Sequence, residues 1–113
     1  MIPGKLNLSC PQGSTFSKSL TYKIDDTPVD LTGYQARLQV REFFYSSNPV
    51  LSLTDGAGIS LGASAGTIGI LIDASTTASL ISGDYVYDLE LVAGGTVTRL
   101  IEGKFVVTPE VTR

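Results

Sequence analysis

Residues Ser82–Gly103, SGDYVYDLELVAGGTVTRLIEG, carry the strongest structural signal in the 113-residue chain. Apolar side chains recur at every second position between Tyr85 and Leu91, and acidic side chains lie between them. This is the period of a β-strand with one buried and one solvated face. Gly94-Gly95 then supplies the positive φ angles that a two-residue hairpin turn requires, and an apolar strand follows. The stretch therefore predicts a β-hairpin.

The position of the turn also predicts a register. A turn at Gly94-Gly95 places Leu89 opposite Leu100 and Glu90 opposite Arg99, so that an apolar pair and an oppositely charged pair face each other. We therefore expect Leu89 in the core, and Glu90 exposed and paired with Arg99.

The rest of the chain shows the same strand periodicity. Strict alternation over Tyr34–Glu42 predicts a strand with one solvated face. Further strands are expected at Lys5–Ser9, Ser14–Ile24, Val50–Leu53, Ile59–Leu61 and Thr67–Ile72. Asp73 can cap one helical turn through Ala78, and Gly103 marks an expected β-bulge. About seven to nine short strands with turns between them predict one all-β domain over residues 1–113, either a β-sandwich or a small barrel.

Composition and charge exclude several classes of function. The net charge is −3 and the basic residues are scattered, so the basic stripe that binds nucleic acid is missing and attraction to an anionic membrane is disfavoured. No apolar run approaches the roughly 20 residues of a membrane span, and the N-terminal stretch MIPGKLNLSC lacks the apolar core of a secretory signal. Cys10 is the one cysteine, so no internal disulfide forms, and a buried thiol is expected.

The residues of common catalytic and cofactor sites are also missing. The chain has no histidine, and no glycine-rich phosphate loop is present. Asp25, Asp26 and Asp30 offer oxygen ligands for calcium, although Asp25-Asp26 is better explained as a hairpin turn. We therefore expect no enzyme, no cofactor, no metal and no small-molecule substrate.

A short aromatic run provides the first candidate interface. Phe43-Phe44-Tyr45 interrupts the alternation, and consecutive aromatic residues at a strand end point to both faces, which predicts a contact with another protein chain. One alternative is a locally folded loop, and another is a platform for sugar binding that also includes Tyr34. The remaining candidates are apolar residues near the two ends of the chain, Ile2, Leu6 and Val111.

Several short motifs resemble a known family. IPGKLNL, PQGSTF, PVDLTGYQARLQVRE, SGDYVYDLEL and VTRLIEGKFVVTPEVTR, in this order, resemble small tailed-bacteriophage virion proteins that have an immunoglobulin-like β-sandwich. The pattern is similar to the N-terminal domain of phage upper baseplate proteins. The resemblance covers nearly the whole chain and implies a single immunoglobulin-like antiparallel sandwich. It also places Tyr85 where a tyrosine corner would tie its hydroxyl back to the preceding turn.

The resemblance implies a structural component of the virion, made in the bacterial host cytoplasm. It would act in the tail or baseplate near fibres or appendages, through contacts with other virion proteins in a symmetric multi-copy assembly. The alternatives are a capsid decoration protein and a carbohydrate-binding module for attachment to the host. The family supplies no ligand-binding residues to carry over.

Overall fold

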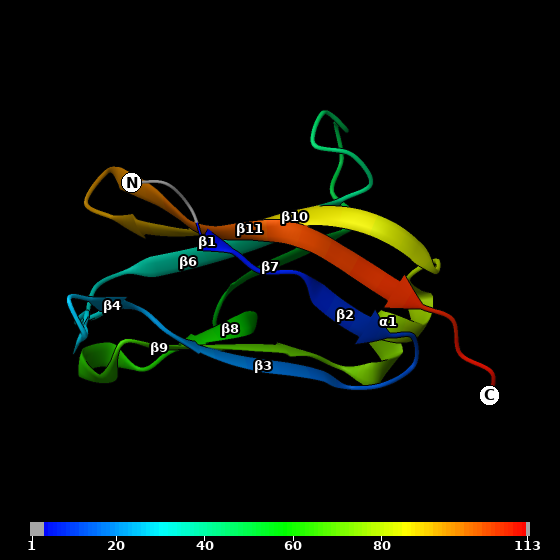
Figure 1. Ribbon diagram of the computed structural model, residues 1–113, viewed down its shortest axis with the longest axis horizontal. Helices are drawn as coiled ribbons and strands as arrows, with labels where there is room; N and C mark the ends of the chain where they lie inside the picture. Colours follow the sequence, from blue (N-terminus) through cyan, green and yellow to red (C-terminus); the bar gives the residue numbers. More distant parts are fainter. Residues whose placement is uncertain (1–3, 113) are drawn as a thin grey trace.

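The computed structural model describes residues 4–112, which form a mostly β structure with 58% of residues in strands and one short α-helix. Figure 1 shows the strands wrapped into a half-barrel. The elements in chain order are β1 (Gly4–Lys5), β2 (Leu8–Pro11), β3 (Phe16–Thr21), β4 (Lys23–Ile24), β5 (Thr27–Pro28), β6 (Gln35–Arg41), β7 (Leu51–Asp55), β8 (Gly58–Leu61), the 3₁₀ turn η1 (Ala63–Ala65), β9 (Thr67–Ile72), α1 (Ala74–Ser79), β10 (Gly83–Ala93) and β11 (Thr96–Thr108).

The main sheet is a single curled mixed sheet, which corrects the expected two-sheet sandwich. Its strand order is β1-β11-β10-β6-β7-β8-β9-β3, and β2 also pairs with β11. The sheet stays continuous because β8 pairs with both β7 and β9. The strands β8, β9 and β3, which would form the second layer of a sandwich, are therefore hydrogen-bonded to the first layer. β1 and β2 run parallel to β11, a pairing between the two ends of the chain.

The predicted hairpin is confirmed and is formed by β10 and β11. Gly94 and Gly95 at its turn have φ angles of 54° and 88°. The register differs from the prediction on one side, because Leu89 lies opposite Ile101 rather than Leu100. The register shifts between Leu89 and Glu90, so Leu100 is the extra residue of a β-bulge.

The prediction for Glu90 is confirmed for its strand register but is wrong for its ion-pair partner. Glu90 lies opposite Arg99 in the register, but its carboxylate accepts a hydrogen bond of 2.7 Å from Arg37 on β6. Its side chain is 23% exposed rather than fully exposed, because β6 covers the other side of β10. Arg99 instead pairs with Asp88 and Glu102.

The core lies on the concave face of the curled sheet. Leu89 is fully buried, as predicted, and packs with alternate residues of β6, β9 and β11. Cys10 is also fully buried, and burial raises the pKa of its thiol. The remaining residues of the buried core are Leu8, Phe16, Leu31, Ala36, Leu38, Val40, Leu53, Ile59, Ile68, Ile70, Ile72, Leu80, Tyr87, Leu91, Phe105 and Val107.

Two turns follow the sequence predictions. The Asp73 side chain accepts the amide hydrogen of Thr76 and caps α1, which closes one end of the half-barrel (Figure 1). Asp25 and Asp26 have φ angles of 51° and 64° and form the turn between β4 and β5. Aspartate tolerates this left-handed region better than most residues do, and this explains the pair at the turn.

Gly103 is not a bulge, contrary to the sequence prediction. It lies opposite Tyr87, and a Cβ atom there would stand 2.2 Å from the Leu6 carbonyl oxygen. The Tyr87 hydroxyl donates a 2.6 Å hydrogen bond to that same oxygen. Glycine is required here because the segment between β1 and β2 passes directly over β11.

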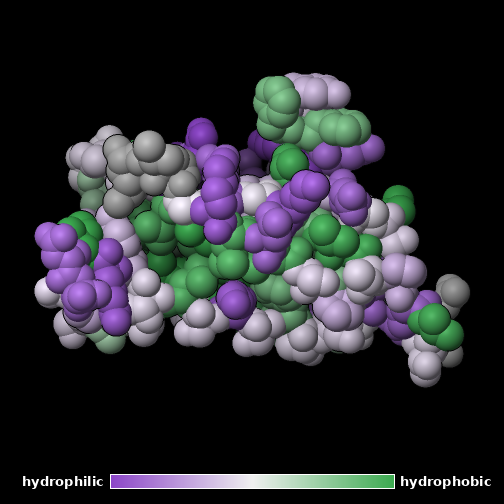
Figure 2. Space-filling view, viewed as in Figure 1, coloured by the Kyte–Doolittle hydropathy of each residue, from purple (hydrophilic) through white to green (hydrophobic). Residues whose placement is uncertain are grey.

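The half-barrel is open between β1 and β3. Figure 2 shows hydrophobic side chains in view between these two edges. Phe16, Lys18 and Leu20 of β3 share the core-facing side, and Lys18 lies opposite the buried Ile70. Lys18 is nevertheless exposed, so the core-facing side of this edge strand reaches solvent through the opening.

Candidate functional site

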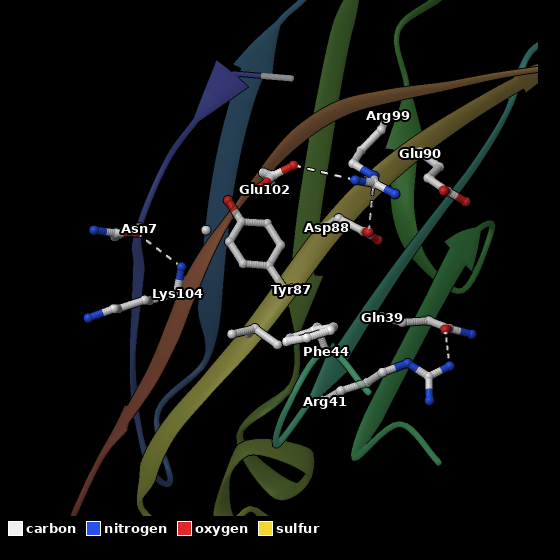
Figure 3. A pocket seen from close by; sticks show the side chains of 12 residues that line it. Asn7, Gln39, Arg41, Phe44, Tyr87, Asp88, Glu90, Arg99, Glu102 and Lys104 are labelled. Carbon is white, nitrogen blue, oxygen red and sulfur yellow. Dashed lines mark hydrogen bonds and ion pairs between the residues drawn. The ribbon is translucent and has the colours of Figure 1, made fainter. Parts of the chain in front are cut away.

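A groove of about 700 Å³ lies on the polar outer face of β6, β10 and β11. Its floor and walls carry carboxylate, guanidinium and amide side chains, and Figure 3 shows how they surround it. β10 contributes Asp88 and Glu90, and β6 contributes Gln39 and Arg41. Strand alternation explains this placement, because the intervening residues of both strands point into the core.

The β-bulge at Leu100 brings Arg99 and Glu102 to the same face of β11. In a regular strand these two residues, three positions apart, would point to opposite faces; with the extra residue, Arg99 lies opposite Glu90 and Glu102 lies opposite Asp88, both on the outer face. The Arg99 guanidinium is 3.4 Å from the Asp88 carboxylate and 3.6 Å from that of Glu102. These separations leave room for further hydrogen bonds from the guanidinium.

The loop between β6 and β7 forms an aromatic wall of the groove. Arg41 donates hydrogen bonds of 2.8 Å to the Ser46 carbonyl and to the Gln39 side chain, and so ties the base of the loop to the sheet. Phe44 lines the groove, and 85% of its surface is exposed. In the view of Figure 3, its ring lies between Tyr87 and Arg41.

Phe44 belongs to an aromatic cluster formed with Phe43 and Tyr45. The Phe43 and Tyr45 rings are stacked with centroids 5.3 Å apart, and Phe44 meets Tyr45 edge-on at 5.2 Å. Phe43 is 49% exposed and Tyr45 is 71% exposed. The cluster stands off the body of the molecule, at the top of Figure 2, and contributes little to the core.

The carboxylates of the groove differ in their electrostatic surroundings. Burial raises the pKa of Asp88, the neighbouring Glu90 adds to this rise, and Arg99 opposes it. The hydrogen bond from Lys5 lowers the pKa of Glu102. The groove therefore holds one carboxylate that is harder to ionise beside one that is easier to ionise.

The predicted interface residues do not gather in one place. Leu6 is partly buried and packs against the core, whereas Val111 is 92% exposed in the C-terminal tail. The tail and the loop that carries Phe43, Phe44 and Tyr45 project from different parts of the molecule (Figure 1). Ile2 lies outside the described residues.

Among residues 4–112, no group of three or more histidine, cysteine, aspartate or glutamate side chains is placed to hold a metal ion. The Asp30 carboxylate accepts hydrogen bonds from the amide and hydroxyl of Thr32, and these bonds lower its pKa. What the groove presents is a set of planar hydrogen-bonding groups beside an aromatic ring.

Sequence reasoning found the aromatic wall but missed the floor. The polar residues at alternate positions of β6 and β10 predict a solvated strand face. Their alternation gave the signal that they share one face, but the neighbouring strands that complete the groove are set by sheet pairing. Asn7, which also lines the groove, comes from the other end of the chain.

Comparison with known proteins gives no identification. No family model and no curated protein sequence matches the chain. In the part of the chain that the structure describes, no helix is long and apolar enough to cross a membrane.

Proposed function

We propose that this protein is a structural component of a tailed-phage virion, acting in the tail or baseplate near fibres or appendages. It works through contacts with other virion proteins in a symmetric multi-copy assembly, and it is not an enzyme. It is made in the bacterial host cytoplasm and functions in the virion. The motifs that resemble phage upper baseplate proteins motivate the proposal. The proposal includes that the β domain is related to immunoglobulin-like domains.

The observation that carries the proposal is the exposed aromatic cluster. Phe43, Phe44 and Tyr45 are 49%, 85% and 71% exposed on a loop that stands off the sheet. Aromatic side chains are enriched at the centres of protein interfaces, because they bury a large area at a small cost in side-chain entropy. Val111 in the tail adds a further place where a neighbouring chain can make contact.

One feature expected for an immunoglobulin-like strand is present. The Tyr85 hydroxyl donates a hydrogen bond to the carbonyl of Ile81, four residues earlier, as a tyrosine corner would. This bond supports the kinship. The single mixed sheet argues against a complete immunoglobulin fold, because that fold is defined by two packed sheets.

The experiment is to purify particles induced from the bacterium that carries the gene and to determine the copy number of this chain by quantitative mass spectrometry. Antibody labelling then locates the chain in electron micrographs. We expect a small multiple of six copies at the tail. Hundreds of copies on the head would favour a capsid decoration protein instead. Absence from purified particles, with the protein present in the cell, would overturn the proposal.

A second test uses single charged substitutions in the aromatic cluster. Phe43→Asp and Tyr45→Asp should block incorporation into particles while the isolated domain still folds, because neither ring belongs to the core. Val97→Asp is the matched control, since Val97 is 49% exposed and lies near the hairpin tip, away from the cluster. Equal incorporation of all variants would show that the aromatic cluster is not part of an interface with other virion proteins.

A further inference from the structure

We propose that the groove between the Phe44 ring and the outer face of β6, β10 and β11 binds a neutral glycan. This inference goes beyond the structural role proposed above and does not depend on it. It rests on the shape of the groove, its charge balance, its hydrogen-bonding groups and the exposed aromatic ring in its wall.

The charge balance of the groove argues against a polyanion. Its lining holds three cationic side chains, Arg41, Arg99 and Lys104, and three carboxylates, Asp88, Glu90 and Glu102. Nucleic acids and acidic polymers need an excess of positive charge to replace their counterions. A groove of balanced charge therefore favours a ligand that is polar but neutral.

The geometry of the polar groups suits hydroxyl groups. Carboxylates, guanidinium groups and primary amides present donors or acceptors in pairs within a plane, which matches neighbouring hydroxyls of a sugar ring. Arg99, 3.4 and 3.6 Å from its two carboxylate partners, keeps donors for such hydroxyls. The Nε2 amide group of Gln39 can also donate to a ligand, because the hydrogen bond from Arg41 uses only the Oε1 atom of this side chain.

The aromatic ring completes the site. The face of an aromatic ring carries partial negative charge and attracts the C–H groups on the apolar face of a sugar. Phe44 is 85% exposed over the groove, so its edge-on contact with Tyr45 leaves most of its surface available to a ligand. Arg41 fixes the base of the loop and thus holds the ring near the polar floor.

A peptide is a less suitable occupant than a glycan. The groove lies over three interior strands, whose backbone groups are paired within the sheet, so a peptide has no strand edge to extend here. The lining also lacks a deep apolar pocket, because its apolar side chains are only Val86 and the two aromatic residues Phe44 and Tyr87. Protein interfaces normally anchor on such pockets.

The test uses the purified chain on an array of neutral and acidic glycans, followed by calorimetric titration with the strongest neutral binder. Phe44→Ala should weaken that binding by at least about tenfold, and Phe44→Trp should retain it. Phe43→Ala is the matched control: its ring lies in the same loop and stacks on Tyr45 but does not line the groove. Circular dichroism checks that each variant is folded.

Three outcomes would overturn the proposal. The first is no binding to any glycan. The second is binding that Phe44→Ala and Phe43→Ala weaken equally. The third is binding to acidic glycans alone that disappears at high salt, which would indicate a charged ligand. Loss of particle incorporation in Phe44→Ala without glycan binding would assign the ring to a protein contact. Because the array needs only the isolated chain, its result is independent of whether the chain occurs in virions.

Discussion

Single residues show how closely burial and polarity alternate along β10. Leu89 faces the concave core and is fully buried, whereas its neighbour Glu90 faces the outer groove and pairs with Arg37. Two adjacent positions thus test the two faces of one strand.

Leu89→Ala should lower the free energy of unfolding by about 2–5 kcal/mol, because it leaves a cavity in the core. Glu90→Ala should cost less than about 1 kcal/mol, because its ion pair with Arg37 is partly exposed to solvent. Chemical denaturation of both variants measures the difference. Equal losses would mean that the two faces are assigned incorrectly.

Tyr87 provides a pH-dependent prediction. Burial raises the pKa of its phenol from 10.0 to about 12. A phenol with a higher pKa in the folded state stabilises that state below pH 10, and this contribution is lost as the pH rises from 10 to about 12. Across this window, wild-type stability should fall by about 1–3 kcal/mol more than that of Tyr87→Phe.

The comparison is made by urea denaturation of both proteins at several pH values. Taking the difference removes the contributions of the lysines and the other tyrosines. Parallel stability curves for wild type and Tyr87→Phe would show that Tyr87 ionises at its ordinary pKa in the folded state.

Among the elements, the segment from β1 to β2 is tied to the β10–β11 hairpin through both residues of its connection, Leu6 and Asn7. It runs parallel to β11, and the carbonyl of Leu6 accepts from Tyr87 while the Asn7 side chain accepts from the amide of Lys104. The missing side chain of Gly103 is what allows this close approach.

Gly103→Ala should destabilise the protein by about 1–3 kcal/mol, because the new Cβ would stand 2.2 Å from the Leu6 carbonyl oxygen and the backbone must shift. Gly4→Ala is the control, since its Cβ would meet its nearest atom at 3.4 Å. Thermal unfolding measures both. A Gly103→Ala protein as stable as Gly4→Ala would rule out this close approach.

The β3 edge leads to a prediction about self-association. Among the described residues, β9 is its one strand partner, and Lys18 places a charge on its core-facing side. A charge pointing inward on an edge strand opposes pairing with another chain. Lys18→Val should therefore produce dimers or larger aggregates in light scattering coupled to size-exclusion chromatography.

Lys18→Glu is the matched control, because it keeps a charge at the same position and should leave the oligomeric state unchanged. If Lys18→Val behaved like Lys18→Glu, the edge of β3 would be protected by something other than this charge.

For the whole molecule, one continuous sheet provides both the core and the outer groove. Its concave face is apolar, its outer face is polar over β6, β10 and β11, and the loop with Phe44 extends over that face. The stability of this arrangement comes from apolar burial and strand pairing across the length of the chain.

Removal of divalent cations should leave the melting temperature unchanged. In residues 4–112 no set of side chains is placed to ligate a metal, and the Asp30 carboxylate is occupied by Thr32. Differential scanning calorimetry with and without EDTA makes the measurement. A fall of several degrees that calcium reverses would restore the metal site considered for Asp25, Asp26 and Asp30.

Local sequence was sufficient for several strands, the hairpin turn and the helix cap, whereas the single strand expected over Ser14–Ile24 divides into β3 and β4, which belong to different sheets. The alternation of β6 and β10, the Gly94-Gly95 turn and the Asp73 cap depend on the side-chain period, positive φ angles and a nearby carboxylate. All of these act over a few residues. The burial of Leu89 follows from the same short-range pattern. For Phe43, Phe44 and Tyr45 the pattern predicts rings on both faces, whereas all three are exposed on a loop.

Tertiary structure alone decided the single mixed sheet, the parallel strands β1 and β2, the bulge at Leu100 and the polar groove. Each depends on pairing between segments far apart in the chain, where many registers are compatible with one alternating pattern. The extra residue at Leu100 places Arg99 and Glu102 on the same face, and the close passage over Gly103 brings Asn7 to the groove. Sequence periodicity assigns a residue to a face, but only the packed sheet determines which faces meet.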